Sequence, residues 1–152
     1  MRLALVAAAV AGTYPLAKRF FPIPQLYLGV AFSFGIPMAF AAALGGADAS
    51  PAPVRAAVPL LALGLLLGNL FGVLAYDTEY AMVDREDDVR LGIRSSAIFF
   101  GRWDVAAVMA CYGAFFSLML LVGNGIHAGW PYYAGWAVGV ACAIYHHALI
   151  RT

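Results

Sequence analysis

The chain has 152 residues, of which 64% are hydrophobic and only 11% are charged, whereas about a quarter of the residues in a soluble domain are charged. This composition excludes an ordinary soluble domain and predicts a membrane protein, because several apolar runs approach the roughly 20 residues that a spanning helix needs. The formal net charge of +1 gives no indication of a nucleic-acid partner. Cys111 and Cys142 lie inside apolar runs without metal-ligand spacing, so we expect them to pack as small hydrophobic residues.

Five apolar runs follow one another along the chain, and they are continuous rather than alternating, so they predict helices and not barrel strands. Breaks are expected at Pro15, Pro22 and Pro24, at GGADASPAP, at the charged stretch Asp77–Arg102 and at GNGIHAGWP. The first run is short for a span. The expected fold is all-α, a polytopic transmembrane helix bundle with spans near Leu3–Leu16, Leu26–Leu44, Ala56–Tyr76, Trp103–Val122 and Tyr132–Ile150.

Small residues and prolines inside these runs predict how the helices pack. Two glycine pairs lie one helical turn apart and favour close approach of neighbouring helices, namely Gly64 with Gly68 and Gly135 with Gly139. Pro37 and Pro59 are expected to kink their helices. Asn69, a polar residue within a span, is a candidate substrate-binding residue, with a hydrogen bond between helices as the alternative role.

The positive charges predict how the chain is oriented in the membrane. Threading five spans places seven of the nine lysines and arginines on one side, with only Arg2 and Arg55 on the other. Because the side rich in lysine and arginine faces the cytoplasm, the connections Tyr14–Phe21 and Asp77–Arg102 are both expected there. Asp48 is the only acidic residue predicted on the far side. His146 and His147 are expected at the cytoplasmic interface, without an acidic partner nearby in sequence.

The segment YDTEYAMVDREDD carries six carboxylates between Asp77 and Asp88, directly after an apolar run. If the helix of that run continues through the segment, Asp77, Asp84 and Asp88 share one face. Such like charges repel unless a cation neutralises them, and Mg²⁺ is commonly held by one or two carboxylates together with substrate phosphates. The segment therefore predicts a magnesium and phosphate site beside the membrane.

Three arginines close to these acids have the donor geometry that phosphate oxygens accept, namely Arg85, Arg90 and Arg94. Together with the apolar helices they suggest a diphosphate whose tail is a lipid. The alternative is a solvated cytoplasmic loop of mixed charge. Glu86 and Asp87 are expected to face solvent under either interpretation.

YDTEYAMVDREDD followed by GIRSSAIFFG resembles the second aspartate-rich motif of the UbiA superfamily of intramembrane prenyltransferases, in its 4-hydroxybenzoate polyprenyltransferase branch. The DxxxD of the family maps onto Asp84 and Asp88, and Asp77 and Tyr80 occupy the matching upstream places. PQLYLGVAFSFGIPMAF resembles the helix that precedes this region in the family, so the resemblance extends over essentially the whole chain.

The family also carries a YxxxK motif in an earlier cytoplasmic loop, and YPLAK supplies it as Tyr14 and Lys18. The catalytic residues that the resemblance implies are Tyr14, Lys18, Asp77, Tyr80, Asp84 and Asp88. The resemblance implies that Mg²⁺ on Asp84 and Asp88 binds the diphosphate of an allylic polyprenyl donor, and that the prenyl group is transferred to the ring of 4-hydroxybenzoate on the ubiquinone pathway. The implied location is the bacterial inner membrane, in contact with lipid and with the catalytic loops in the cytoplasm. Basic residues and metal would stabilise the departing diphosphate.

The sequence departs from the family pattern in one important respect, because the family's first motif, NxxxDxxxD, is absent. Asn69 lacks the pair of aspartates that would follow at those spacings. The family fold has nine helices, and residues 1–152 match about the fourth to the eighth as one partial transmembrane domain, with 77–102 as its aspartate-rich catalytic loop. We therefore expect the chain alone to be inactive.

Three other interpretations remain open at the level of the sequence. The first is another enzyme of the superfamily with a different aromatic acceptor. The second is a small membrane carrier that uses Asp77, Asp84 and Asp88 as a cation site, although a conduction site is expected at membrane depth. The third is a scaffold or assembly subunit in which the acids have no fixed function.

Overall fold

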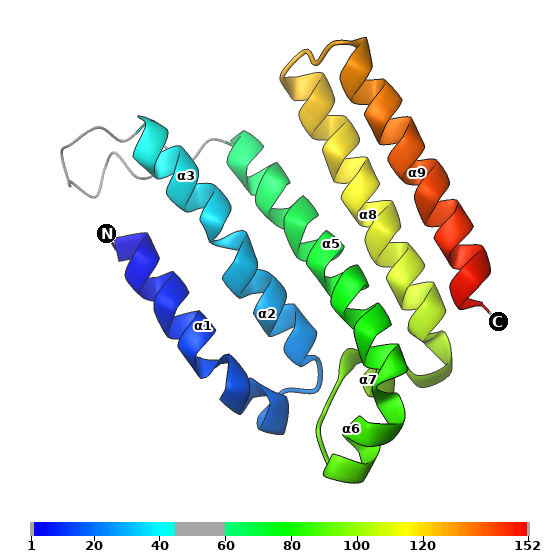
Figure 1. The fold of residues 1–152 in the computed structure, drawn as a ribbon. Helices are drawn as coiled ribbons and strands as arrows, with labels where there is room; N and C mark the ends of the chain where they lie inside the picture. Colours follow the sequence, from blue (N-terminus) through cyan, green and yellow to red (C-terminus); the bar gives the residue numbers. More distant parts are fainter. Residues whose placement is uncertain (1, 45–59, 152) are drawn as a thin grey trace.

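The structure is a computed structural model that describes residues 2–44 and 60–151, and over these ranges it consists of helices without strands. Figure 1 shows the long helices side by side in chain order, as a row rather than a closed ring. Neighbours in the row are in contact, with α5 in the middle touching both α2 and α8. The helices are α1 Arg2–Phe20, α2 Pro24–Ser33, α3 Gly35–Leu44, α5 Leu60–Val83, α6 Arg85–Leu91, α7 Ser96–Phe100, α8 Asp104–Gly125 and α9 Trp130–Ile150, with the 3₁₀ turn η1 at Gly101–Trp103.

Among the described residues, four helical segments are long and apolar enough to cross a membrane. At most 22% of the apolar window of any of them is buried inside the molecule, so most of their apolar surface needs lipid or further protein to cover it. The all-α, polytopic membrane architecture is confirmed, with four candidate spans in place of five. They are Pro24–Ala43, Leu60–Val83, Ser96–Gly125 and Trp130–Ile150.

The first predicted span, Leu3–Leu16, is not among these four candidate spans, and its end also differs from the prediction. Helix α1 passes through Pro15 and ends only at Phe20, with Lys18 and Arg19 in its last turn. The expected break at Pro15 is therefore wrong. A proline removes one backbone donor, whereas stopping the helix would free several backbone groups that are costly to leave unpaired beside hydrocarbon. The chain breaks instead around Pro22, before α2 begins at Pro24.

The span Pro24–Ala43 is interrupted at Phe34, between α2 and α3. Pro37 cannot donate to the carbonyl four residues before it, at Ser33, and this accounts for the interruption there. The Ser33 hydroxyl accepts a hydrogen bond of 3.1 Å from the Asn69 side-chain amide, which ties the break to α5. The expected effect of Pro37 is thus seen as an interruption of the helix one turn before it, and the kink itself stays a prediction. Pro59, Asp48, Arg55 and the GGADASPAP connection lie outside the described residues.

Glycines on α5 and α9 allow the close helix packing that the sequence predicts. A Cβ at Gly64 would lie 3.2 Å from Val122, and one at Gly68 would overlap Met119, so both glycines face α8. Of the second pair, Gly139 faces Phe116, where a Cβ would lie 2.9 Å from the ring. For Gly135, no atom of the described residues lies within 4 Å of the Cβ position, so close packing at that residue stays a prediction.

Replacing Gly29 by leucine is expected to lower the melting temperature of the purified protein in nanodiscs. A Cβ at this position would lie 2.8 Å from Leu70 Cδ1 and 3.4 Å from the Leu70 carbonyl oxygen, so a larger side chain must push α2 away from α5. Such overpacking costs about 1–3 kcal/mol. Gly113→Leu is the matched control, because nothing lies within 4 Å of its Cβ position. Equal melting temperatures for the two variants would contradict this packing.

Candidate active site

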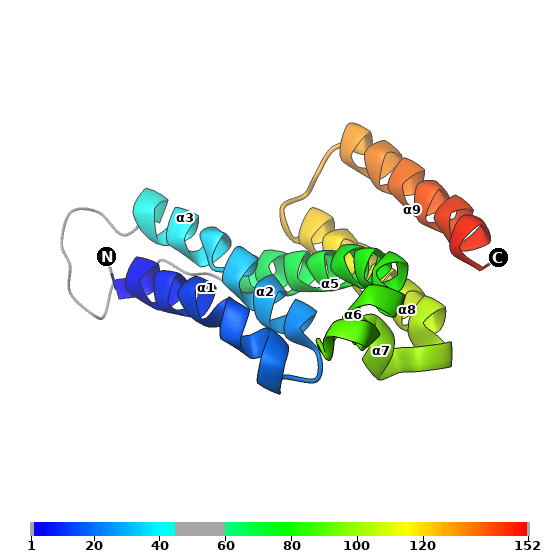
Figure 2. The same cartoon turned by 60° about the horizontal axis from the view of Figure 1, so that its bottom comes forward.

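The aspartate-rich segment does not continue α5 as one helix. Helix α5 ends at Val83, Asp84 has φ −84° and ψ 3°, and α6 begins at Arg85 in a new direction. Figures 1 and 2 show α6 turned out of the line of α5, at the end of the row of helices where α7 also lies. The expectation of one helix with Asp77, Asp84 and Asp88 on a single face is therefore wrong.

The helix macrodipole accounts for this bend. With a new helix beginning at Arg85, its first turn contains Glu86, Asp87 and Asp88, where the positive end of the dipole stabilises carboxylates. In a continued α5 the same residues would lie at the negative end and would be destabilised. The Asp88 N–H donates 2.9 Å to the Asp84 carbonyl, so the two aspartates remain one turn apart across the bend.

The segment after α6 joins the two predicted motifs. Helix α6 ends at Gly92 in the left-handed conformation, with φ 65°, which glycine adopts readily. Beyond it the Arg94 N–H donates 3.3 Å to the Lys18 carbonyl, and the Arg94 guanidinium donates 2.8 Å to the Phe20 carbonyl. The two polar connections therefore meet at one end of the molecule, which confirms that they share a face.

This junction brings four of the predicted catalytic residues together. The Lys18 ammonium lies 5.6 Å from the centroid of the Tyr14 ring, within the range of a cation–π interaction. It is also within electrostatic range of the Asp77 carboxylate, and Tyr14 is within range of both Asp77 and Asp88. Residues that are 59 to 74 positions apart in the sequence thus surround one polar region beside the membrane.

Asp84 and Asp88 differ from the other acids of α6 in their contacts. Within the part of the chain that the structure describes, neither carboxylate forms a hydrogen bond or an ion pair with another side chain. Glu86 and Asp87 instead lie 3.5 Å from the Arg90 guanidinium, with side chains 87% and 76% exposed. The expectation that Glu86 and Asp87 face solvent is confirmed. We refer to Asp84 and Asp88 below as the acid pair.

The acid pair has the donor set for a hard cation. No group of three or more histidine, cysteine, aspartate or glutamate side chains with metal-binding geometry occurs in residues 2–44 and 60–151, so the described residues form no closed metal cage. Two carboxylates with free oxygens do fit an Mg²⁺ ion whose remaining coordination positions are filled by substrate phosphates and water. An Mg²⁺ ion on the acid pair would therefore keep open positions for a ligand.

Tyr80, the remaining predicted catalytic residue, forms a pair with Tyr76 on the same side of α5. The Tyr76 hydroxyl donates 3.0 Å to the Tyr80 hydroxyl, and the ring centroids are 4.8 Å apart in an edge-to-face arrangement. Both side chains are more than half exposed. Sequence reasoning did not identify Tyr76, although its spacing of four residues from Tyr80 on a helix places the two rings together.

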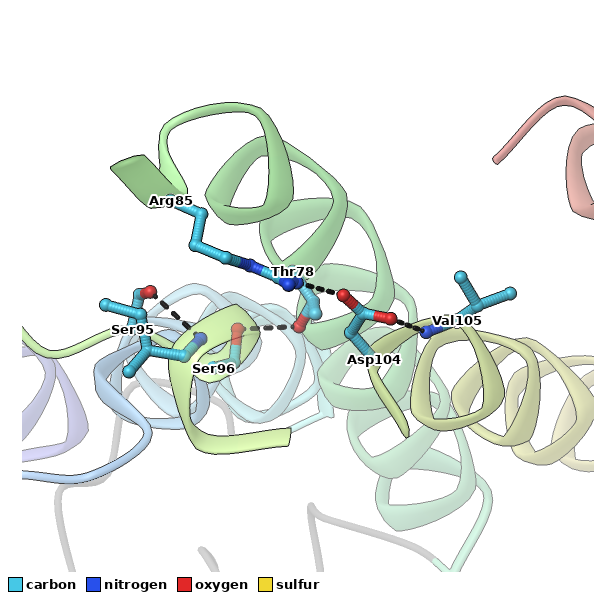
Figure 3. Close-up of polar contacts among 7 residues, drawn as sticks. Thr78, Arg85, Ser95, Ser96, Asp104 and Val105 are labelled. Atoms are coloured by element: carbon cyan, nitrogen blue, oxygen red, sulfur yellow. Dashed lines mark hydrogen bonds and ion pairs between the residues drawn. The ribbon is translucent and has the colours of Figure 1, made fainter. Parts of the chain in front are cut away.

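The four predicted substrate-binding residues all have partners within the protein. Arg85 pairs with Asp104, as Figure 3 shows, whereas Arg90 pairs with acids of its own helix. Arg94 binds the end of α1, and Asn69 binds Ser33. Asn69 thus forms the hydrogen bond between helices that was the alternative to substrate binding. In this structure the arginines organise the site, and Arg94 remains exposed to solvent beside it.

A buried polar cluster fixes α7 against α5 and was not identified from the sequence. The Thr78 hydroxyl donates 2.6 Å to the Leu74 carbonyl and lies 2.8 Å from the Ser96 hydroxyl (Figure 3). The Ser96 N–H donates 2.9 Å to the side-chain oxygen of Gln25 on α2. Ser95 caps α7 by accepting from the Ile98 N–H at 3.4 Å. A serine before a short apolar run is a capping signal that the sequence does contain.

Helix α9 is joined to the site region through a second unpredicted cluster. The His146 Nδ1 atom lies 3.2 Å from the Glu79 carboxylate on α5, and the centroid of the His146 ring lies 6.5 Å from that of the Tyr112 ring on α8. His146 therefore has an acidic partner, although none lies nearby in sequence. Its neighbour His147 has a buried Nδ1 atom with no hydrogen-bond partner among the described residues.

Comparison with known proteins gives relatives that share one name. The chain is 58% identical over 149 residues to the 4-hydroxybenzoate octaprenyltransferase of Cupriavidus pinatubonensis, and 53% identical over 149 residues to that of Burkholderia mallei. Each match covers 98% of this chain but 48% of the relative, so the chain spans about half the length of the curated relatives it matches. No solved structure matches the chain.

The whole sequence, residues 1–152, matches the model of a single protein family. That match agrees with the motifs that meet at the end of α1 and α5, and with the multi-pass helical architecture. The chain belongs to the UbiA prenyltransferase family.

Proposed function

We propose that this chain forms part of an Mg²⁺-dependent 4-hydroxybenzoate polyprenyltransferase, which transfers a polyprenyl group from polyprenyl diphosphate to the ring of 4-hydroxybenzoate in ubiquinone biosynthesis. The observation that carries the proposal is the acid pair, Asp84 and Asp88, whose carboxylates are unpaired in the described structure. Asp88 lies within electrostatic range of Tyr14, and Lys18 within range of Asp77, at the same end of the molecule. The names of the relatives support the choice of donor and acceptor.

The acid pair would hold Mg²⁺, which when bound neutralises the charge that develops on the departing diphosphate. Lys18 adds a positive charge on the same side, near Asp77. The exposed part of Arg94 is positioned to contact phosphate oxygens or the benzoate carboxylate. These residues bind the polar end of the donor, while its apolar tail lies along the lipid-facing helices.

In the reaction the bond between the allylic carbon and the diphosphate oxygen breaks, and the electron pair leaves with the diphosphate. A new carbon–carbon bond forms at the ring position ortho to the hydroxyl of 4-hydroxybenzoate, and transfer of the proton from that position to the released diphosphate or to water restores aromaticity. The half-buried ring of Tyr14 and the exposed rings of Tyr76 and Tyr80 lie at the end of the molecule that carries the acids, and their negative faces would stabilise positive charge on the allylic carbon.

We further propose that residues 77–102 form the cytoplasmic catalytic loop of a protein in the bacterial inner membrane, and that residues 1–152 correspond to about the fourth to the eighth of nine helices. The excess of lysine and arginine at this end supports the orientation. Because the sequence contains no NxxxDxxxD motif, we expect the chain to lack half of the metal ligands and to be inactive alone.

A grafting experiment tests the proposed function. The chain replaces the matching segment of the Burkholderia mallei relative, and the resulting protein, called here the graft, is expressed in a bacterium that lacks its own 4-hydroxybenzoate prenyltransferase. We expect the graft to restore ubiquinone and the 152-residue chain alone not to. A correctly inserted graft that restores no ubiquinone would contradict the proposal, and prenylation of a different aromatic acid would correct the acceptor.

A further inference from the structure

Arg85 lies where it could neutralise the acid pair. It follows Asp84 directly and precedes Asp88 by three residues on α6, a spacing at which side chains on a helix are neighbours. Arg90 illustrates this on the same helix, because its guanidinium lies 3.5 Å from Asp87, three residues before it. A guanidinium at position 85 is therefore within reach of the Asp88 carboxylate.

The Arg85 side chain instead points away from α6 to Asp104, the first residue of α8, as Figure 3 shows. Asp104 is 7% exposed, and the Arg85 side chain is 36% exposed. The second oxygen of Asp104 accepts a hydrogen bond of 2.6 Å from the Val105 N–H. The N-terminus of α8 also stabilises this negative charge, so Asp104 is a fixed anion on a candidate spanning helix.

We propose that Asp104 is a positioning residue that holds the Arg85 guanidinium away from Asp84 and Asp88, so that this acid pair stays available for a cation. The part of the proposal that concerns the cation rests on the proposed function, whereas the position of Arg85 does not. Without Asp104, Asp88 is a carboxylate of the same helix within reach of Arg85 by its spacing of three residues, and a guanidinium bound there would compete with a divalent cation.

The first experiment measures the electrostatic potential at α6 and needs no metal. Val89, 61% exposed on α6, is replaced by cysteine in the full chain after Cys111 and Cys142 are replaced by alanine. The ratio of its reaction rates with a cationic and an anionic methanethiosulfonate reports the local charge. This ratio is measured for Arg85→Met, for Asp104→Asn and for the two together, in nanodiscs without divalent cations.

We expect Arg85→Met to raise the ratio by less than about twofold when Asp104 is present, and by roughly threefold or more in the Asp104→Asn background, where the guanidinium would be close to Val89. If fixed charges simply add, Arg85→Met has the same effect in both backgrounds, and that result would overturn the proposal. Asp87→Asn is the matched control. Asp87→Asn removes a charge from the same helix but leaves the Arg85–Asp104 pair in place. Arg85→Met should therefore change the ratio by the same factor with and without Asp87→Asn.

The second experiment measures Mn²⁺ binding by electron paramagnetic resonance, with Mn²⁺ as the probe for a divalent cation. Asp104→Asn is expected to weaken Mn²⁺ binding by about 10-fold, a loss typical of groups that orient metal ligands. Adding Arg85→Gln to Asp104→Asn should restore the binding.

If Asp104→Asn does not fold, the Mn²⁺ affinity of the single variant Arg85→Gln tests the proposal. This affinity should differ from wild type by less than about twofold, because Arg85 is already held away from the acid pair. A marked tightening would overturn the proposal. All Mn²⁺ measurements use the graft, because the chain alone is expected to lack half of the metal ligands. If the unmodified graft shows no Mn²⁺ binding that Asp84→Asn removes, the proposed metal role is wrong, while the cysteine reporter still decides the position of Arg85.

Discussion

Replacing either Asp84 or Asp88 by asparagine in the graft is expected to lower kcat by at least about 100-fold, a loss typical when a group that stabilises transition-state charge is removed. The reason is that both carboxylates are unpaired among the described residues and Asp88 lies within electrostatic range of Tyr14, so their oxygens are available to a cation at this end of the molecule. Prenylated product is quantified by mass spectrometry at saturating donor and acceptor.

The same helix provides the control for this experiment. Asp87→Asn changes an acid of the same type, one residue before Asp88, but the Asp87 side chain is 76% exposed and pairs with Arg90. We therefore expect kcat within about twofold of wild type, since exposed ion pairs contribute little. If Asp87→Asn reduces kcat as much as Asp88→Asn does, the acids act through overall charge, and the assignment of the acid pair would be wrong.

Replacing Arg94 by alanine is expected to lower both the stability and kcat of the graft, the latter by about 10-fold. Arg94 donates 2.8 Å to the Phe20 carbonyl and connects the end of α1 to the segment after α6. Loss of a hydrogen bond from a charged donor costs about 1–2 kcal/mol, and the change separates Tyr14 and Lys18 from the acids. Thermal unfolding and steady-state kinetics are measured on the same preparations.

Arg102→Ala is the control for Arg94→Ala. Arg102 is an exposed arginine of the same polar end, and its guanidinium lies 5.1 Å from the Trp103 ring centroid. It should leave the melting temperature and kcat nearly unchanged. If Arg94→Ala raises KM for the diphosphate without changing the melting temperature, Arg94 serves as a substrate ligand and not as the link between α1 and α6.

Periodicity and composition were sufficient to predict most of the fold. Continuous apolar runs located the spans because lipid requires long helices with internally satisfied backbones. The lysine and arginine bias, together with two short motifs, placed Tyr14 and Lys18 at the same end as Asp77 and Asp88, and the Arg94 hydrogen bonds to Lys18 and Phe20 confirm that placement. These signals are local, and each can be identified from a few neighbouring residues.

The features that the sequence did not reveal depend on distant partners or on competition between local effects. The break at Asp84 follows from the dipole of α6, because carboxylates are more stable at the N-terminus of a new helix than at the C-terminus of a longer α5. Asp104 gives no signal of its own, because its role depends on an arginine 19 positions away. Glu79 and His146 meet only because α5 and α9 both lie beside α8 at this end of the row.

The most direct test of the account is to assay the purified graft with polyprenyl diphosphate and 4-hydroxybenzoate, with Mg²⁺ present and after its removal by a chelator. The account predicts a product whose mass is that of 4-hydroxybenzoate plus one prenyl group less one hydrogen, formed only with Mg²⁺ and restored when Mg²⁺ is added back. Product formation at an unchanged rate without divalent cations would contradict a cation held by Asp84 and Asp88.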